Sequence, residues 1–549
     1  MHTGDDSHSG ARRVLTSGRT DGRTEESPGR AGFPRRLRVL AAATVLVFVA
    51  LAVSGLAGPA DSDQRQLPRV TLTLVPHAAS VPVPRSYLGL STEYWALPLY
   101  ARHLATFERV LRLIHVPGDG PLILRVGGDS ADHAFWDPRL RELPPWAFSL
   151  TPEWTGLTAG IVRRLGVRLI LDLNLITNTP DTAAMWARAA EAWLPHHSII
   201  GFEIGNEPDI YSRRGWMRVT AGDLMAGAVL PAALTVHDYL GDFRAYGSTL
   251  REVAPHLPLI GPAVAEPRAH WRWVRALLAS RAPGLSMISV HRYPYSGCVR
   301  RRSASFPTIA RVLSARASTV LAAELAPMIA RTHRAGLPFR LTELNSVTCG
   351  GRPGVSDTFA TALWAPDTLF ALLRARADGV NLHVRANTIN APFAFTPRGL
   401  FARPLLYGLM MFSRALAGGV ALEPSHLQAA PSLRVHTWVV RTRRGALHIL
   451  AIDKGARAVG LRLRIAATAP ATVQQLRAGS PSARFGVTLG GQHIGPRGQW
   501  LGRPQTETVR RSGRGYLVTV PRNGATLITV NPRPAPSAPV TLTGLAPVT

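Results

Sequence analysis

The feature that most limits the fold of this chain is a regular alternation of apolar, strand-like runs with helical patterns between residues 85 and 418. The strand-like runs are 86–95, 121–132, 167–175, 201–211, 257–265, 285–295, 337–346 and 379–387. Helical patterns separate them, and a last one closes the series at 402–417. Such alternation is typical of parallel βα units. Eight units in succession predict an α/β fold, a (β/α)8 TIM barrel over 85–418. An open, doubly wound sheet is the alternative, but no G-x-G-x-x-G motif follows the first strand.

After Gly419 the pattern changes to short strands separated by Gly-rich turns. These strands are 433–442, 446–453, 460–465, 516–521 and 525–531. They predict a C-terminal antiparallel β-sandwich domain over 419–532. A strand-like run that precedes the barrel, 70–76, is expected to pair into this domain. Residues 533–549 are Pro-rich and are expected to form a loose tail.

The first 60 residues bear on where the protein resides. Residues 1–38 contain eight arginines, and the 19 residues that follow, 39–57, carry no charge. About 20 apolar residues span a bilayer, and the preceding arginines predict that the N-terminus stays in the cytoplasm. We therefore expect 1–38 to be a cytoplasmic tail and 39–60 to be a single-pass transmembrane anchor or a cleaved signal segment. Residues 61–84 would be a linker and a joining strand, and the remainder would be extracytoplasmic.

The chain is strongly basic, with 63 Lys+Arg against 34 Asp+Glu and a formal net charge of +29. Lys454 is the only lysine, so the excess is almost entirely arginine. One interpretation is attraction to an acidic polysaccharide, to nucleic acid or to a membrane surface. The other is a compositional bias that replaces Lys by Arg. No Lys/Arg run with interleaved aromatics is present, so no nucleic-acid partner is predicted.

The stretch GFEIGNEPDIY, 201–211, contains the first candidate catalytic residue. Its apolar beginning reads as a buried strand, and Pro208 cannot donate to a strand ladder, so the strand should end near it. Glu207 would then lie at the C-terminal rim of the fourth strand, where barrel enzymes collect catalytic side chains. Asn206 beside it can hydrogen-bond a sugar hydroxyl.

A second carboxylate, Glu343, lies near the end of the seventh strand, on the opposite side of the barrel mouth. Two facing carboxylates can cleave a glycosidic bond, because one protonates the leaving oxygen while the other acts as nucleophile or base. Screening from water should keep Glu207 protonated, whereas neighbours such as Tyr293 or Arg340 could hold Glu343 ionised. Two carboxylates suffice for this reaction, so no metal or cofactor is predicted.

Several motifs resemble glycoside hydrolase family 79, which contains heparanases and β-glucuronidases. They are Asn206-Glu207-Pro208, the strand-six sequence HRYPY (291–295) and the stretch TELNSVTCGGRPGVSDTFATALWAPD (342–367). The resemblance covers about 85–418 and extends into the β domain. It implies a retaining mechanism in which Glu207 is the acid/base and Glu343 is the nucleophile.

The same resemblance implies how an acidic sugar would be recognised. In that family two glycines after the nucleophile let backbone N–H groups meet the uronic carboxylate, and Gly350 and Gly351 fit this role. Without a Cβ, the backbone can approach an anion closely. A family tyrosine near strand eight is replaced here by the sequence Asn381-Leu382-His383. Arg385 could substitute as the anion partner.

Other polar residues follow the predicted strands at the same rim. The candidate sugar-binding residues are Glu93, Asp129, His291 and Tyr293. Trp95, Trp136 and Trp364 could stack on sugar or fill the core. The two cysteines, Cys298 and Cys349, could be free thiols or form one disulfide. Both fall in loops after strands six and seven, so a disulfide between them would order the loop that carries the two glycines.

These observations predict an exported, retaining hydrolase of β-linked uronic-acid glycosides, of β-glucuronidase or heparanase type. Its partners would be an acidic oligo- or polysaccharide or a glucuronide, and the membrane through the N-terminal segment. Two alternatives stay open: a β-glycosidase for neutral sugars on the same barrel, and a surface protein that binds glycans without cleaving them.

Overall fold

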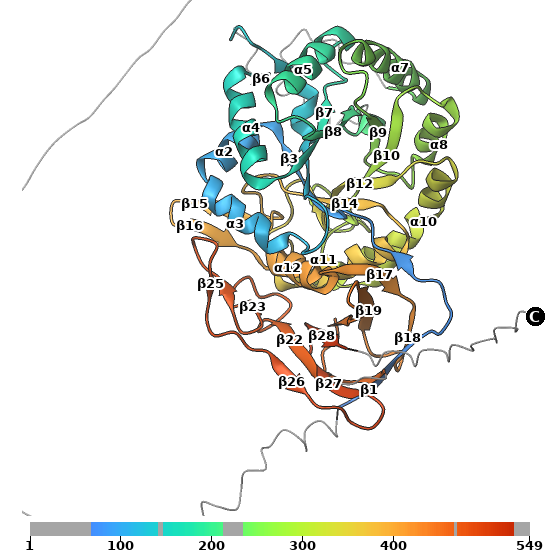
Figure 1. The fold of residues 1–549 in the computed structure, drawn as a ribbon, viewed down its shortest axis with the longest axis vertical. Helices are drawn as coiled ribbons and strands as arrows, with labels where there is room; N and C mark the ends of the chain where they lie inside the picture. The colour runs from blue at the N-terminus through green and yellow to red at the C-terminus, as the bar shows by residue number, and fades with distance from the viewer. Residues whose placement is uncertain (1–66, 141–146, 212–233, 466–468, 532–549) are drawn as a thin grey trace, which may run out of the picture. The chain divides into compact units, whose positions relative to one another are not determined.

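The structure is a computed structural model that describes residues 67–140, 147–211, 234–465 and 469–531. Eight parallel strands close into a barrel in the order β10-β12-β14-β3-β4-β7-β8-β9 (Figure 1). In chain order they are β3 (Leu88–Glu93), β4 (Ile123–Gly127), β7 (Arg168–Leu173), β8 (Ile199–Ile204), β9 (Leu259–Val264), β10 (Leu285–Arg292), β12 (Phe339–Leu344) and β14 (Gly379–His383). The predicted (β/α)8 barrel is confirmed.

Helices surround the barrel, as Figure 1 shows. They are α2 (Leu97–Arg102), α3 (Leu104–Ile114), α4 (Pro152–Leu165), α5 (Pro180–Trp193), α7 (Val236–Val253), α8 (Trp271–Ser280), α10 (Thr319–Arg334), α11 (Phe359–Arg374) and α12 (Pro404–Leu416). Helix α4 begins after Thr151, whose side chain caps it by accepting a hydrogen bond from the Trp154 N–H. The helical region between β10 and β12 is divided into α9 (Ile309–Val312), η4 (Ala315–Ala317) and α10.

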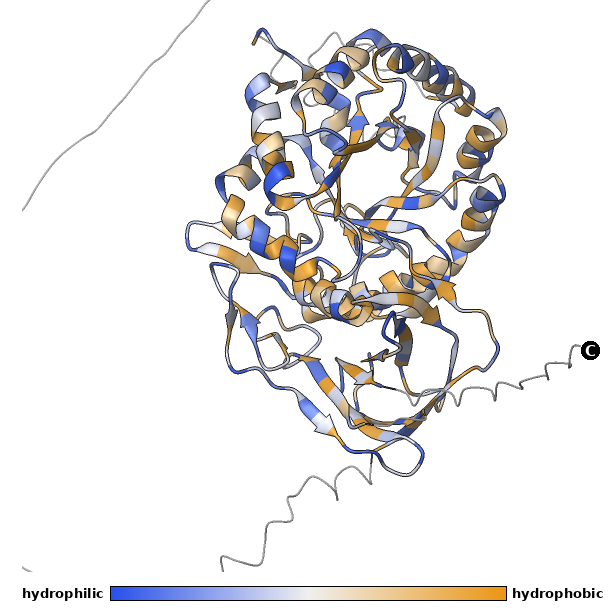
Figure 2. Cartoon of the chain, in the orientation of Figure 1, coloured by the Kyte–Doolittle hydropathy of each residue, from blue (hydrophilic) through white to orange (hydrophobic). Residues whose placement is uncertain are grey.

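The barrel strands are buried on both faces. Every residue of β3, β4, β9, β12 and β14 is buried, as expected for strands between a filled barrel interior and an outer layer of helices. Figure 2 shows hydrophobic residues along these strands and mixed hydrophobic and hydrophilic residues on the outer helices. A polar residue on such a strand therefore needs a buried partner.

Two sheets form the β domain. One has the order β18-β1-β21-β27, and the other follows the path β2-β17-β19-β20-β28-β22-β23 with β26 beside β22. Their bounds are β1 (Arg69–Leu74), β2 (Val81–Pro82), β17 (Gly419–Glu423), β18 (Ser425–Gln428), β19 (Val435–Thr442), β20 (Leu447–Asp453), β21 (Val459–Arg464), β22 (Ala471–Arg477), β23 (Thr488–Leu489), β26 (Glu507–Val509), β27 (Tyr516–Val520) and β28 (Gly524–Val530).

The strand predicted at 70–76 does pair into the β domain, as β1. It runs antiparallel to β18 but parallel to β21, so the domain is not purely antiparallel. The parallel pair is possible because the whole barrel lies between these two strands in sequence. Side chains of both sheets share one apolar cluster that includes Leu72, Val439 and Ile528. The predicted sandwich is therefore confirmed, although the sequence did not indicate β22.

A buried ion pair joins the barrel to the β domain. The Asp367 carboxylate on α11 accepts hydrogen bonds from Lys454 Nζ at 2.6 Å and from Trp438 Nε1 at 3.0 Å. His436 Nδ1 lies 2.9 Å from the same carboxylate. The only lysine of the chain is thus buried against an acid of the other domain.

The predicted N-terminal tail, the segment 39–60 and the Pro-rich tail all lie outside the described residues. Within the residues that are described, no helix has the length and apolar character needed to cross a membrane.

Candidate active site

Glu207 and Glu343 both lie at the C-terminal end of the barrel strands. Strand β8 ends at Ile204, earlier than predicted, and Glu207 follows in a left-handed backbone conformation with φ of 50°. It immediately precedes the short 3-10 helix Pro208–Ile210, and its N–H donates to the Ala263 carbonyl at 3.2 Å. A non-glycine residue with positive φ is strained, and such strain is often found at functional sites. Glu343 lies within β12.

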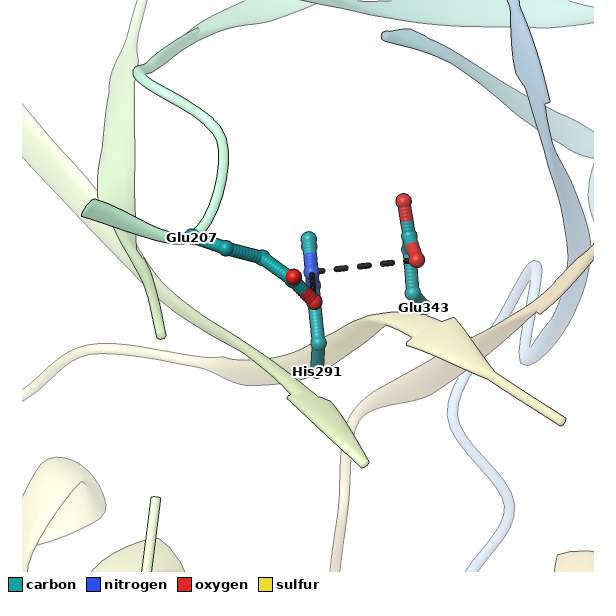
Figure 3. Close-up of side chains that lie close together, drawn as sticks. All are labelled: Glu207, His291 and Glu343. Carbon is teal, nitrogen blue, oxygen red and sulfur yellow. Dashed lines mark hydrogen bonds and ion pairs between the residues drawn. The ribbon is translucent and has the colours of Figure 1, made fainter. Parts of the chain in front are cut away.

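His291 stands between the two carboxylates (Figure 3). Its Nδ1 lies 2.9 Å from Oε1 of Glu207 and 3.8 Å from Oε2 of Glu343. One donor atom from each of the three residues lies within 4.8 Å of the others, close enough to hold a metal ion. An oxygen of Glu207 and an oxygen of Glu343 thus approach within 4.8 Å. This close approach is compatible with the roughly 5–5.5 Å between the carboxyl groups of retaining glycosidases.

Glu343 is surrounded by groups that favour its ionised form. The Tyr293 hydroxyl donates to Oε2 at 2.7 Å, and Arg125 Nη1 donates to Oε1 at 2.6 Å. His383 Nδ1 lies 3.3 Å from Oε1. Burial alone would raise the pKa of Glu343, but attraction to His383, His291 and Arg125 and the Tyr293 hydrogen bond outweigh it and lower this pKa to about 2.

The pKa of Glu207 is shifted in the opposite direction, upward. Burial raises the pKa of its carboxyl group, and the hydrogen bond and charge of His291 offset only part of this increase. The nearby charge of Glu343 raises the pKa further. Two facing carboxyl groups with pKa values moved apart in this way can act as acid and nucleophile at the same pH.

Arg125 is the most important residue that the sequence reasoning missed. Its side chain is 0% exposed and contacts Glu343 and the Oδ1 of Asn206, the latter at 3.1 Å from Nη2. A signal was present, because Arg125 interrupts the apolar run of the second strand. A buried charge is costly unless it is paired, so an arginine in such a strand predicts buried acids nearby.

Arg340 does not contact the nucleophile position, contrary to what the sequence suggested. Its Nε donates to Oδ1 of Asn381 at 2.6 Å, and its Nη atoms donate to the Ser86 carbonyl at 3.2 Å. These partners lie toward the start of the strands, whereas Glu343 lies at their end. Of the two neighbours proposed from the sequence, only Tyr293 bonds to Glu343.

Glu93, Asp129 and Arg385 form a second charged group on one side of the site. Arg385 Nη1 donates to Oδ2 of Asp129 at 3.0 Å, and its Nε lies 3.9 Å from Oε1 of Glu93. The Ser130 N–H donates to the other oxygen of Glu93 at 2.9 Å. Burial raises the pKa of Asp129 to about 6, although Arg385 lowers it. Arg385 is 36% exposed, so it can reach a ligand only in competition with Asp129.

The two glycines after β12 differ in what they can offer an anion. The Gly351 N–H donates to the Thr348 carbonyl at 3.1 Å and is therefore already used. A Cβ on Gly351 would lie 2.7 Å from side-chain atoms of Ile389 and Asn390, so this glycine is required by close packing. Gly350 has a φ of +71°, and its carbonyl accepts the Asn390 N–H at 3.1 Å. Of these two glycines, Gly350 therefore stays the candidate for the predicted role.

The predicted disulfide between Cys298 and Cys349 is present. It joins the loops after β10 and β12, next to the parallel pairing of β11 (Tyr295–Ser296) with β13 (Val347–Thr348). Cys349 directly precedes Gly350, so the bond fixes one end of the glycine turn. Of the three tryptophans considered, Trp364 is fully buried and donates to the Ala317 carbonyl, which identifies it as a core residue.

Comparison with known proteins agrees with this geometry. No protein-family profile matches the chain. A β-glucuronidase from Aspergillus niger is 25% identical over 386 residues, which make up 63% of this chain and 67% of that protein. This similarity confirms the resemblance that the motifs indicated.

Solved structures share the fold at lower identity. A 4-O-α-L-rhamnosyl-β-D-glucuronidase from Fusarium oxysporum superposes with a TM-score of 0.68 at 16% identity, over 84% of this chain and 100% of that one. A family 51 arabinofuranosidase from Xanthomonas axonopodis pv. citri gives a TM-score of 0.61 at 15% identity, over 84% and 99% of the two chains. Each similarity therefore extends over nearly the whole of the known structure and most of this chain.

Proposed function

We propose that this protein is a retaining glycoside hydrolase that cleaves β-linked glucuronides, with Glu207 as acid/base and Glu343 as nucleophile. The observation that carries the proposal is the pair of carboxyl groups that bring oxygen atoms within 4.8 Å of each other and whose pKa values are moved in opposite directions. That combination is what double displacement requires, because one group must be ionised while the other carries a proton.

The reaction has two steps. In the first, a carboxylate oxygen of Glu343 attacks the anomeric carbon, the bond to the leaving oxygen breaks, and Glu207 gives that oxygen its proton. In the second, the Glu207 carboxylate removes a proton from water, the water oxygen attacks the anomeric carbon, and Glu343 leaves as a carboxylate. Tyr293 and Arg125 hold Glu343 in place. They also stabilise its negative charge before the first step and again when it leaves in the second.

The choice of a uronic acid rests on the A. niger β-glucuronidase likeness and on the region around Gly350. There the Gly350 N–H would bind the sugar carboxylate, with Arg385 as a cationic partner and Asn206 and Tyr293 near the sugar hydroxyls. Glu93 and Asp129 would accept hydrogen bonds from hydroxyl groups. A neutral sugar is the second candidate, and a specific observation favours it: Arg385 is already paired with Asp129.

The setting of the enzyme is also part of the proposal. We infer an extracytoplasmic location, because a disulfide persists in oxidising compartments and the sequence begins with an Arg-rich tail before an apolar segment. Segment 39–60 is proposed as anchor or cleaved signal. The boundaries 85–418 for the catalytic barrel and 419–532 for the β domain are likewise proposed.

Hydrolysis of an aryl β-glucuronide and an aryl β-glucoside by the wild type tests the proposal, with Glu343→Ala as the matched control. We expect a higher kcat/KM on the glucuronide and no turnover by the variant. Preference for the glucoside would favour the neutral-sugar enzyme. Equal inactivity of both proteins on every aryl glycoside would favour a glycan-binding protein without catalysis.

A further inference from the structure

A single buried guanidinium connects the two halves of the site. Arginine has five N–H donors in a rigid planar fork, and each donor of Arg125 has an acceptor. Nε donates to Glu203 Oε2 at 2.7 Å, Nη1 to Glu343 Oε1 at 2.6 Å and Ser91 Oγ at 3.4 Å, and Nη2 to Asp172 Oδ2 at 2.6 Å and Asn206 Oδ1 at 3.1 Å. The guanidinium plane is therefore fixed in position and in rotation.

Two of these acceptors lie behind Arg125 and away from solvent. Asp172 on β7 and Glu203 on β8 face each other across the paired strands, and both side chains are 0% exposed. The second oxygen of Glu203 accepts from the Thr342 hydroxyl at 2.8 Å, so this carboxylate is itself held at both ends. Neither residue contacts the Glu207 carboxylate or His291 in the hydrogen bonds and ion pairs of the described residues.

Gly127, the last residue of β4, leaves the space that the side chains of Asp172 and Arg125 occupy. A Cβ at Gly127 would lie 2.4 Å from Cβ of Asp172 and 2.9 Å from Cζ of Arg125. Any larger residue would push the carboxylate and the guanidinium apart. Three carboxylates share one cation here, and burial raises the pKa of Asp172. Burying so many charges lowers the free energy of unfolding unless they are well paired, so stability alone does not explain the arrangement. A role in the site does.

We propose that Asp172 and Glu203 are positioning residues that act through Arg125 to aim Glu343 and to fix the amide of Asn206. This inference rests on the proposed function. Because Oδ1 of Asn206 accepts from Arg125, its Nδ2 stays the donor that would bind a sugar hydroxyl in the proposed complex. The same cation thus orients the nucleophile and a sugar-binding donor.

The first experiment compares Glu203→Gln and Asp172→Asn with the wild type on an aryl β-glucuronide. It measures kcat, KM and the rate of covalent labelling by a 2-deoxy-2-fluoro-β-glucuronyl fluoride. We expect kcat and the labelling rate to fall about 10- to 100-fold with little change in KM. Losses of about this size are typical when a residue that hydrogen-bonds to a metal ligand, and so orients it, is replaced. Glu203→Asp keeps the charge and shortens the side chain, so it gives a smaller loss in a variant that retains the buried ion pair.

Asp367→Asn is the matched control, because it removes a buried carboxylate that contacts Lys454 far from the site. Assayed below its unfolding temperature, this variant should label and turn over at the wild-type rate. Equal slowing of Asp367→Asn and Asp172→Asn would mean that lost stability explains both, and the inference would be overturned.

A double-mutant cycle tests the route through Arg125. Arg125→Lys keeps a positive charge but loses the fork, so it should slow labelling on its own. If Glu203 acts through the guanidinium, adding Glu203→Gln to Arg125→Lys should slow labelling by less than about twofold further. Fully additive losses would overturn the inference while leaving the proposed function intact. A wild type that neither turns over nor labels would overturn both.

Discussion

Nδ1 of His291 lies 2.9 Å from Glu207 and 3.8 Å from Glu343, so one imidazole interacts with both carboxyl groups of the site. Its proximity lowers the pKa of each of them. Burial opposes this effect at Glu207 and prevails, whereas at Glu343 the additional partners Arg125, His383 and Tyr293 prevail over burial. The difference between acid and nucleophile therefore comes from burial and from the other neighbours, whereas His291 lowers the pKa of both groups.

The pH dependence of kcat/KM should reveal this arrangement. The alkaline limb reports loss of the Glu207 proton, and the acid limb reports protonation of Glu343 near its pKa of about 2. His291→Gln removes a group that lowers both pKa values, so both limbs should move to higher pH. Tyr293→Phe removes a hydrogen bond to Glu343 alone, so only the acid limb should move up. An unmoved alkaline limb in His291→Gln would contradict the assignment of Glu207.

Replacement of the acid should have an effect that depends on the leaving group. Glu207→Ala should lose about 10²–10⁴-fold in kcat/KM on a glucuronide with a poorly acidic leaving group, because general acid catalysis contributes about that much. A dinitrophenyl glucuronide, whose leaving group needs no proton, should lose far less. Glu343→Ala should be inactive on both substrates. The measurement is kcat/KM across a leaving-group series, and equal losses of Glu207→Ala along the series would exclude the acid role.

The sequence was sufficient for the barrel because long apolar runs and helical patterns alternate eight times. It also placed Glu207 and Glu343 at strand ends, since parallel strands bring their C-terminal ends to one rim. The contacts between strands could not be predicted in the same way. The register of β10 against β12 shifts between Val290 and His291, and that of β12 against β14 shifts between Leu341 and Leu344.

These shifts change which side chains point inward. Thr342 and Glu343 are consecutive, yet Thr342 bonds to buried Glu203 and Glu343 bonds to buried Arg125. Regular alternation would direct Thr342 and Glu343 to opposite faces, so the pattern of β12 could not predict that both bond to buried side chains of the barrel interior. The five partners of Arg125 come from separate elements, and only the folded barrel brings them together.

The ion pair between the domains should contribute strongly to stability. Asp367→Asn leaves Lys454 buried without its counter-charge, which typically costs about 3–5 kcal/mol. Lys454→Met in the same chain should recover much of this loss, because the double variant buries no unpaired charge. Thermal unfolding of the wild type and the two variants measures the effect, and an unchanged Tm in Asp367→Asn would contradict it.

The pH dependence of this effect follows from the depressed pKa of Asp367, which its contacts with Lys454 and His436 lower despite burial. A carboxyl group with a lowered folded-state pKa stabilises the fold above its unfolded pKa of about 3.9 and loses that contribution as pH falls further. The Tm difference between wild type and Asp367→Asn should therefore be full near pH 7 and should shrink below about pH 4. A difference that grows with acidification would have the wrong sign.

Removal of the disulfide should loosen the loop that carries Gly350. The bond closes a separation of 51 residues, for which chain entropy predicts a stabilisation of about 4 kcal/mol. Cys298→Ser with Cys349→Ser should therefore lower Tm, and it should raise KM for an aryl glucuronide more than for an aryl glucoside. The comparison of KM values distinguishes loss of carboxylate binding from general loosening, which would raise both equally.

The glycine turn offers a matched pair of substitutions that separates packing from substrate binding. Gly351→Ala places a Cβ 2.7 Å from Asn390 and Ile389, so it should lower Tm and activity on every substrate. A Cβ on Gly350 would lie 3.5 Å from Thr388, an ordinary contact, and the penalty is mainly that of positive φ, about 1 kcal/mol. Gly350→Ala should therefore remain folded.

The Gly350→Ala substitution should change specificity, because the Gly350 N–H would bind a uronic carboxylate. A shift of this backbone group should reduce kcat/KM for an aryl glucuronide while leaving that for an aryl glucoside nearly unchanged. Assays of both substrates with both variants, beside their Tm values, measure the effect. If Gly350→Ala lowers the two activities equally, the N–H does not select the acidic sugar, and Arg385 becomes the candidate for that role.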